Sequence, residues 1–250
     1  MSNPRLLPKL LIVQTGTCAE ALRAVHGDYP DWFTRALADE AQVSVLRAHE
    51  GERLNRQSLA QHAPRGILVT GSPLSATERA PWMLELGDAL LRAGKDGTPV
   101  LGVCFGEHLL GQAAGGQLIK NPRGREIGTV KIQLTQAGRR DPLFAWAAAE
   151  ASGELEMQAT HVDAVDPLPP GASLLASNEN TASQAFRLSE TVAGVQFHPE
   201  LTPEALRFLI DSRADAIRAG GLDPKALRDR VRPTPGRSLL RAWVDQVRKA

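Results

Sequence analysis

A short apolar run, Pro99–Val103, leads directly into Cys104, and the cysteine has a glycine two residues before it and another two residues after it. Beyond Gly106 the apolar residues follow the spacing of a helix. A strand that turns so sharply into a helix strains the residue at the apex, and glycines beside it remove side chains that would collide. The pattern predicts a nucleophile elbow with the thiol at a helix N-terminus, where the helix dipole favours the thiolate. A buried structural cysteine is the alternative, because free cysteine is among the most buried residue types.

Short apolar runs alternate with helix-patterned segments through the first half of the chain. The runs are continuous and rich in branched residues, as expected for strands covered on both faces; they are Leu10–Gln14, Val43–Arg47, Gly66–Thr70 and Pro99–Val103. Helix spacing is found between them over Asp31–Ala41 and Ala80–Ala93. The alternation predicts an α/β fold with a flavodoxin-like, mostly parallel sheet flanked by helices, in which function collects at the carboxyl ends of the strands.

The second half of the chain has a different organisation. Short strand-like pieces separated by Pro, Gly and Asn turns predict a small antiparallel excursion from the sheet, formed by Thr129–Leu134, Leu155–Ala159 and Ser173–Ala176. A further strand, Val192–Phe197, is expected to return the chain to Cys104. From Thr202 onward the pattern is helical, with breaks at Gly220-Gly221 and at residues 232–236. We expect one domain over residues 1–250, with a catalytic core at about 8–200 and a helical C-terminal extension at 201–250.

His198 and Glu200 follow the last of these strands and are separated only by Pro199. On an extended backbone, residues two apart share a face, and a residue before proline is pushed towards extended geometry. The carboxylate can therefore lie beside the imidazole. A cysteine nucleophile needs a base, and the base needs an orienting partner. The spacing indicates that His198 is the base for Cys104 and that Glu200 orients it.

The composition limits which classes of binding partner and which cellular compartment we expect for this protein. The 29 basic and 28 acidic residues give a net charge of +1, which provides no general attraction to nucleic acid or membrane. The excess of basic residues after Thr202 is interpreted as a solvated helical surface. No apolar run approaches the ~18–20 residues that span a bilayer, and the first residues lack a signal-peptide cleavage site. Two distant cysteines, Cys18 and Cys104, fit a reducing cytoplasm. The isolated histidines His26, His49 and His62 show no metal-ligand spacing, and the sequence has no phosphate-binding glycine motif, so no metal or cofactor is expected.

Several motifs together resemble the class I glutamine amidotransferases, a family with a Cys-His-Glu triad. From about Leu10 to Glu200 they follow the family's order and spacing, and they are Val69–Pro73, Gly102–Gly106, Gly115-Gly116, Thr160–Asp163 and Gly194–Glu200. Residues 27–33 add a resemblance to free-standing members related to the GMP-synthase amidotransferase.

The resemblance implies a role for each matching position. Cys104, His198 and Glu200 would form the triad, and the backbone N–H groups of Gly71 and Phe105 would form the oxyanion hole. The implied substrate-binding residues are His108, Thr160, His161, Val162 and Asp163. The family usually has Gln at the position of His108. A histidine there can still donate a hydrogen bond to glutamine, or it signals another γ-glutamyl compound. The neighbouring Glu107 is expected on an exposed face of its helix.

The activity that the resemblance implies is hydrolysis of the glutamine side-chain amide through a γ-glutamyl thioester on Cys104, which releases ammonia and glutamate. No synthetase domain is recognisable in the sequence, so a separate synthetase subunit would use the ammonia, or the enzyme acts alone. A γ-glutamyl peptide hydrolase with the same triad is the alternative. A non-enzymatic regulatory protein that retains the fold is a third hypothesis, and the intact triad argues against it.

Overall fold

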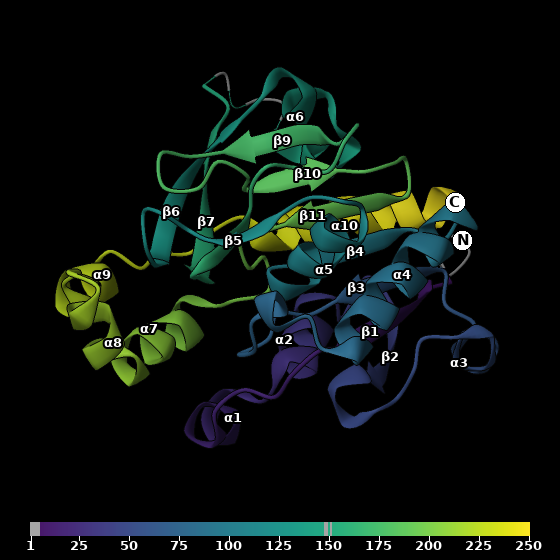
Figure 1. Cartoon of the computed structure of the whole chain (residues 1–250), viewed down its shortest axis with the longest axis horizontal. Helices are drawn as coiled ribbons and strands as arrows, with labels where there is room; N and C mark the ends of the chain where they lie inside the picture. Colours follow the sequence, from purple (N-terminus) through teal and green to yellow (C-terminus); the bar gives the residue numbers. More distant parts are fainter. Residues whose placement is uncertain (1–5, 148–149, 151) are drawn as a thin grey trace, which may run out of the picture.

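A nine-stranded sheet runs through the centre of the protein, with strand order β2-β1-β3-β4-β11-β10-β9-β6-β7 (Figure 1). The structure is a computed structural model that describes residues 6–147, 150 and 152–250. The parallel part of the sheet consists of β2 (Gln42–Arg47), β1 (Lys9–Gln14), β3 (Gly66–Val69), β4 (Val100–Val103) and β11 (Val192–Val195). The predicted flavodoxin-like, mostly parallel sheet is confirmed, and its strands lie where the apolar runs placed them.

The antiparallel strands continue the same sheet beyond β11. They are β10 (Ala185–Arg187), β9 (Ser173–Ser177), β6 (Glu126–Leu134) and β7 (Glu154–His161). A separate two-stranded sheet pairs β5 (Leu118–Lys120) with β8 (Asp163–Val165). The predicted antiparallel excursion is confirmed. The short strand β10, which the sequence patterns did not predict, joins it to the parallel strands.

Helices cover both faces of the sheet (Figure 1). In chain order they are α1 (Glu20–His26), α2 (Tyr29–Ala36), α3 (Arg56–His62), α4 (Pro81–Lys95), α5 (Phe105–Ala113), α6 (Gln136–Arg140), α7 (Pro203–Ser212), α8 (Ala214–Ala219), α9 (Pro224–Asp229) and α10 (Gly236–Lys249). Alternate residues of β1 pack in opposite directions. Leu10 and Ile12 share a core with α2 and α10, whereas Leu11 and Val13 share a core with α4 and α5. A strand buried on both faces requires the continuous apolar run that the sequence has.

The predicted helix over Asp31–Ala41 is wrong at both ends, because α2 covers Tyr29–Ala36. The side chain of Asp28 accepts a hydrogen bond from the Tyr29 N–H (2.9 Å) and completes a capping box with Asp31. The helix therefore begins two residues earlier than expected. It ends before Leu37, which is fully buried in the core while the chain turns.

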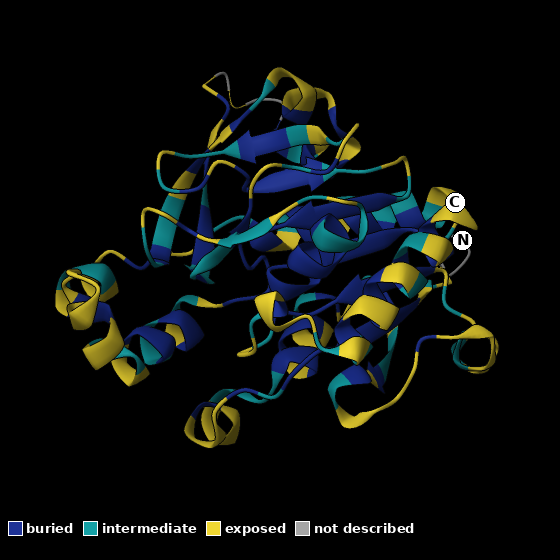
Figure 2. Cartoon of the chain, in the orientation of Figure 1, coloured by how far each residue is buried: buried dark blue, intermediate teal, exposed yellow. Residues whose placement is uncertain are grey.

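The C-terminal helix α10 lies on the sheet and contributes large side chains to its core (Figure 1). Its buried residues include Leu239, Leu240, Trp243 and Val244. In contrast, α8 and α9 lie at the edge of the molecule and are largely exposed (Figure 2). None of the described helices is long and apolar enough to cross a membrane.

Candidate active site

Cys104 occupies the apex of a sharp turn between β4 and α5. It is the residue before the helix, with φ 51° and ψ −104°, a conformation that a residue with a side chain rarely adopts. The two flanking glycines are required by close approach. A Cβ on Gly102 would lie 2.6 Å from the carbonyl carbon of Gly106, and a Cβ on Gly106 would lie 2.7 Å from the Val69 carbonyl oxygen. The turn therefore has the geometry of a nucleophile elbow.

His198 and Glu200 lie just beyond the end of β11, which is the parallel neighbour of β4. The Nδ1 atom of His198 is 2.6 Å from Oε1 of Glu200, and both side chains are buried. Burial lowers the pKa of His198, but the negative charges of Glu200 and Cys104 more than offset this effect and raise the pKa to about 10. Among the described residues, the Nε2 atom of His198 has no partner that meets hydrogen-bond geometry, so this nitrogen is free to exchange a proton with a reacting group.

Gly71 follows β3 and lies against both the cysteine and the histidine. A Cβ on this residue would be 2.8 Å from Cε1 of His198 and 3.7 Å from the Cβ of Cys104. Only a glycine lets the imidazole come this close to the loop. The N–H groups of Gly71 and Phe105 donate to no acceptor in the described part of the chain. Within that part, both N–H groups are therefore without a protein acceptor, as the predicted oxyanion hole requires, and that role stays a prediction.

The peptide that carries the Gly71 N–H is held by a buried threonine that the sequence reasoning missed. The Thr15 hydroxyl lies 3.0 Å from the Thr70 carbonyl oxygen and 3.0 Å from the Gly71 carbonyl oxygen. Thr15 is fully buried at the end of β1. Because the N–H of a trans peptide points away from its C=O, holding the Thr70 carbonyl also fixes the direction of the Gly71 N–H.

We expect Thr15→Val to lower kcat by about tenfold while KM changes little, because the loop would lose the hydroxyl that fixes the direction of the Gly71 N–H, which is predicted to be an oxyanion donor. The free energy of unfolding should fall by about 1–2 kcal/mol, since a buried carbonyl loses a donor. Steady-state kinetics and urea denaturation measure the two effects. The matched control is Thr17→Val, because Thr17 bonds His49 instead (3.0 Å). Unchanged kcat in Thr15→Val would refute the assignment.

A cavity of about 550 Å³ opens beside Cys104. Its lining brings together Cys104, Phe105 and all five of the predicted substrate-binding residues, which are His108, Thr160, His161, Val162 and Asp163. It also contains Lys120, Arg125 and Arg213, which no sequence motif had singled out. The elements that meet here are distant in sequence, so their convergence depends on the fold.

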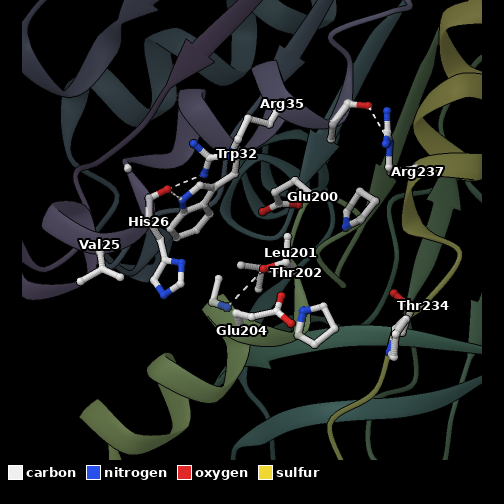
Figure 3. A pocket seen from close by; sticks show the side chains of 16 residues that line it. Val25, His26, Trp32, Arg35, Glu200, Leu201, Thr202, Glu204, Thr234 and Arg237 are labelled. Carbon is white, nitrogen blue, oxygen red and sulfur yellow. Dashed lines mark hydrogen bonds between the residues drawn. The ribbon is translucent and has the colours of Figure 1, made fainter.

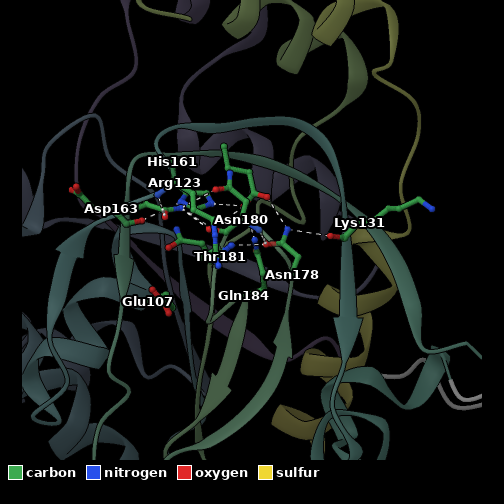
Figure 4. A network of polar contacts seen from close by, with 12 residues as sticks. Glu107, Arg123, Lys131, His161, Asp163, Asn178, Asn180, Thr181 and Gln184 are labelled. Atoms are coloured by element: carbon green, nitrogen blue, oxygen red, sulfur yellow. Dashed lines mark hydrogen bonds and ion pairs between the residues drawn. The ribbon is translucent and has the colours of Figure 1, made fainter. Parts of the chain in front are cut away.

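The side chains of His108 and His161, both predicted to bind substrate, form hydrogen bonds to other groups of the protein. His161 has Glu126 Oε2 at 2.9 Å from Nε2 and the Asp163 carbonyl oxygen at 3.0 Å from Nδ1, so both ring nitrogens are engaged (Figure 4). Nε2 of His108 lies 2.9 Å from Oε1 of Gln196, and burial lowers the pKa of His108 to about 4. His108 is therefore neutral at physiological pH. Its ring can offer only Nδ1 to a ligand, while His161 can offer only its backbone.

The remaining predicted substrate-binding residues are also fixed by neighbours. The Thr160 hydroxyl accepts a hydrogen bond from Arg213, and the Val162 carbonyl accepts one from the Asn121 N–H (2.8 Å). Oδ2 of Asp163 accepts a hydrogen bond from the Ser75 hydroxyl (2.6 Å), which ties this wall of the cavity to the loop that follows Gly71. Whether these residues bind substrate stays a prediction.

Glu107 was expected on an exposed helix face, and this expectation is wrong. The side chain is completely buried against β11, where its Cγ would lie 2.6 Å from a Cβ on Gly194. Neither carboxylate oxygen has a hydrogen-bond partner among the described residues, and burial raises its pKa well above the ordinary value. The simple helical periodicity failed because α5 is covered on more than one side, by the sheet, by α4 and by the β5–β8 pair.

A second cavity, of about 700 Å³, lies next to Glu200 and is not lined by Cys104 or His198 (Figure 3). Trp32 and Arg35 of α2 form part of its wall, and the Trp32 indole donates to the His26 carbonyl (2.9 Å). Within the described ranges, no group of three or more His, Cys, Asp or Glu side chains could hold a metal ion.

Comparisons with known proteins extend these observations. Residues 29–211 match the family described as glutamine amidotransferase class-I. γ-Glutamyl peptidase 4 of Arabidopsis thaliana is 27% identical over 216 residues, which cover 85% of this chain and 82% of the relative. The glutamine-hydrolysing GMP synthase of Edwardsiella ictaluri is 34% identical over 183 residues, which cover 70% of this chain but only 33% of that enzyme. The crystal structure of a glutamine amidotransferase from Thermotoga maritima has the same fold, with a TM-score of 0.74 over 97% of this chain and 99% of that one, at 20% identity.

Proposed function

Because the chain belongs to the class I glutamine amidotransferase family, we propose that it hydrolyses γ-glutamyl amides, with glutamine as the simplest substrate, through a thioester on Cys104. One observation carries the proposal. Gly71 lies against both Cys104 and the imidazole of His198, and that imidazole is bound to Glu200. A cysteine at an elbow, a buried base with a free nitrogen and two unpaired N–H donors are the parts that acyl transfer needs.

In the first half of the reaction, the Cys104 thiol gives its proton to Nε2 of His198, and its sulfur attacks the amide carbon of the substrate. The carbonyl oxygen becomes an oxyanion that accepts hydrogen bonds from the Gly71 and Phe105 N–H groups, each worth about 3–4 kcal/mol in related chemistry. The carbon–nitrogen bond then breaks, and Nε2 of His198 gives its proton to the departing amine. The raised pKa of His198 keeps the proton available for this step at neutral pH.

In the second half, water replaces the amine. Nε2 of His198 takes a proton from the water as the oxygen attacks the thioester, and the same two N–H groups hold the second oxyanion. The carbon–sulfur bond breaks, which releases glutamate and restores Cys104. Glu200 holds Nδ1 throughout, so that Nε2 faces the reacting atoms.

Glu200→Gln is expected to change the pH dependence of catalysis. In the native enzyme, kcat/KM should decline as pH rises through about 10, where His198 loses its proton. Removal of the Glu200 charge leaves burial to lower the pKa, so the alkaline limb should move to lower pH by more than one unit. At pH 7.5 we expect kcat/KM to fall by about tenfold. A pH–rate profile from pH 6 to 11 measures the shift, and an unmoved limb would count against Glu200 as the orienting residue.

A γ-glutamyl peptide hydrolase is the second candidate, and it uses the same residues as far as the thioester. It differs only in the amine that leaves. The similarity to γ-glutamyl peptidase 4 supports this candidate, as does the set of cationic side chains in the cavity beside Cys104.

Glutamate release from glutamine and from γ-glutamylglycine tests the proposal. We expect release from at least one of the two, abolished in Cys104→Ala. A folded protein that releases glutamate from neither would contradict the proposal and favour a non-enzymatic role. If glutamine is the substrate, a separate synthetase subunit is the expected consumer of ammonia, and affinity capture followed by a coupled assay would identify it.

A further inference from the structure

The cavity beside Cys104 is rich in positive charge. Its charged lining residues include the cations Lys120, Arg125 and Arg213, and the acidic residue among them is Asp163. His108 is neutral, as described above, and Nε2 of His161 lies 2.9 Å from Oε2 of Glu126. The cavity therefore carries a formal charge of about +2 before a ligand binds.

Arg125 is half-buried, and its guanidinium makes no hydrogen bond or ion pair with any described residue. Burial lowers the pKa of Arg125, and the nearby positive charge of Arg213 lowers it further. The two guanidinium groups line the same cavity, and neither forms an ion pair with a carboxylate among the described residues. An anion bound at this site would offset their repulsion and satisfy their free N–H donors.

A rigid polar network holds the backbone next to Arg125. The following residue, Glu126, accepts hydrogen bonds from Asn178 (2.7 Å), Thr181 (3.1 Å), Gln184 (2.6 Å) and His161 (2.9 Å) (Figure 4). Asn121, on the turn that precedes Arg125, donates to the Thr181 hydroxyl (3.1 Å). The backbone that carries the unpaired Arg125 guanidinium is therefore held in place by hydrogen bonds on both sides.

Arg213 reaches the same cavity from a different part of the chain. It lies between α7 and α8, and its guanidinium donates to the hydroxyl of Thr160 on β7. Arg213 also lines the small hollow that contains both Cys104 and His198. One hydrogen bond leaves most of its five N–H donors available to a ligand.

We propose that Arg125 and Arg213 bind a carboxylate on the leaving group of the substrate, so that the enzyme prefers γ-glutamyl compounds with an acidic leaving amine, such as γ-glutamyl amino acids, over glutamine. The inference rests on the proposed thioester chemistry and names its substrate class. Glutamine is a zwitterion without net charge, so it leaves the charge of the cavity uncompensated. A γ-glutamyl amino acid brings one further carboxylate, which two planar guanidinium groups can bind in bidentate fashion.

A matched pair of substrates tests this inference without any variant. γ-Glutamylglycine and γ-glutamylglycinamide share the scissile bond and differ in one negative charge. We expect kcat/KM to be at least about tenfold higher for the acid than for the amide, with the ratio falling at high salt. Similar kcat/KM values for the two compounds would overturn the inference but leave the thioester mechanism standing. Failure to hydrolyse either compound or glutamine would overturn both.

Substitutions of Arg125 test whether this residue causes the preference for an acidic leaving group. Arg125→Gln should reduce kcat/KM for γ-glutamylglycine by about tenfold or more and leave the value for γ-glutamylglycinamide within about threefold. Arg125→Lys should retain part of the preference. Arg123→Gln is the control, because Arg123 lies on the same turn, is exposed and does not line the cavity. An unchanged acid-to-amide ratio in Arg125→Gln would overturn the role of Arg125. Equal losses on both substrates would do the same, because they would indicate a structural role.

Discussion

Replacing Cys104 with alanine is expected to lower kcat by at least about 10³-fold, because no other cysteine that the structure describes lines the cavity to form the thioester. The oxyanion donors and the cavity would remain, so substrate binding should persist. The free energy of unfolding should change by no more than about 1 kcal/mol, since only the sulfur atom is lost. Glutamate-release kinetics and thermal denaturation measure both effects.

The other cysteine provides the control for this substitution. Cys18 is buried beside Asp28, and burial with the Asp28 charge raises its pKa to about 12, so it is a poor nucleophile. Cys18→Ala should retain kcat within about twofold. If Cys104→Ala kept substantial activity, or if Cys18→Ala lost it, the assignment of the nucleophile would be wrong.

Gly71→Ala is the second substitution with a large expected effect. Its new methyl group would lie 2.8 Å from Cε1 of His198, so either the imidazole or the loop must move. A displacement of about 1 Å at reacting atoms costs about 10²-fold in rate, and we expect kcat to fall by at least that factor. The alignment of the Gly71 N–H with the oxyanion would change as well.

The free energy of unfolding should distinguish this loss of kcat from a general loss of structure. Gly71 has an ordinary negative φ, so alanine adds no backbone strain of its own, and the free energy of unfolding should fall by about 2 kcal/mol or less. Gly220→Ala is the matched control, because a Cβ there meets nothing closer than 3.4 Å and the residue lies far along the chain, after α8. A Gly71→Ala enzyme with near-native kcat would contradict the proposed arrangement.

The parts of the site that the sequence predicted are those encoded by local spacing. The glycines around Cys104 indicate a strained turn, and Pro199 between His198 and Glu200 indicates an extended pair. The structure shows the close approaches behind the first pattern and the 2.6 Å contact behind the second. Short-range geometry of this kind is readable because backbone sterics act over a few residues.

Other parts of the site depend on contacts between distant segments. Thr15 meets Thr70 across 55 positions, and Arg213 meets Thr160 across 53. The fold also buries Glu107 completely, although its place in a helix suggested exposure. Spacing within one element does not reveal which neighbours cover it, so these residues could be found only after the chain was folded.

The fold, like the site, could be predicted only where a long enough local pattern encodes it. The continuous apolar runs predicted the parallel strands because strands covered on both faces need such runs. The three-residue strand β10 carries too short a pattern to be recognised, although it joins the antiparallel strands to β11.

Covalent labelling tests most directly whether Cys104 attacks the γ-carbonyl of the substrate. The enzyme would be treated with a diazoketone that mimics glutamine, and the modified peptide would be identified by mass spectrometry. We expect one adduct, on the peptide that contains Cys104, formed in proportion to the loss of activity and absent from Cys104→Ala. An adduct on Cys18 or elsewhere, or full activity in an enzyme completely labelled at Cys104, would contradict it.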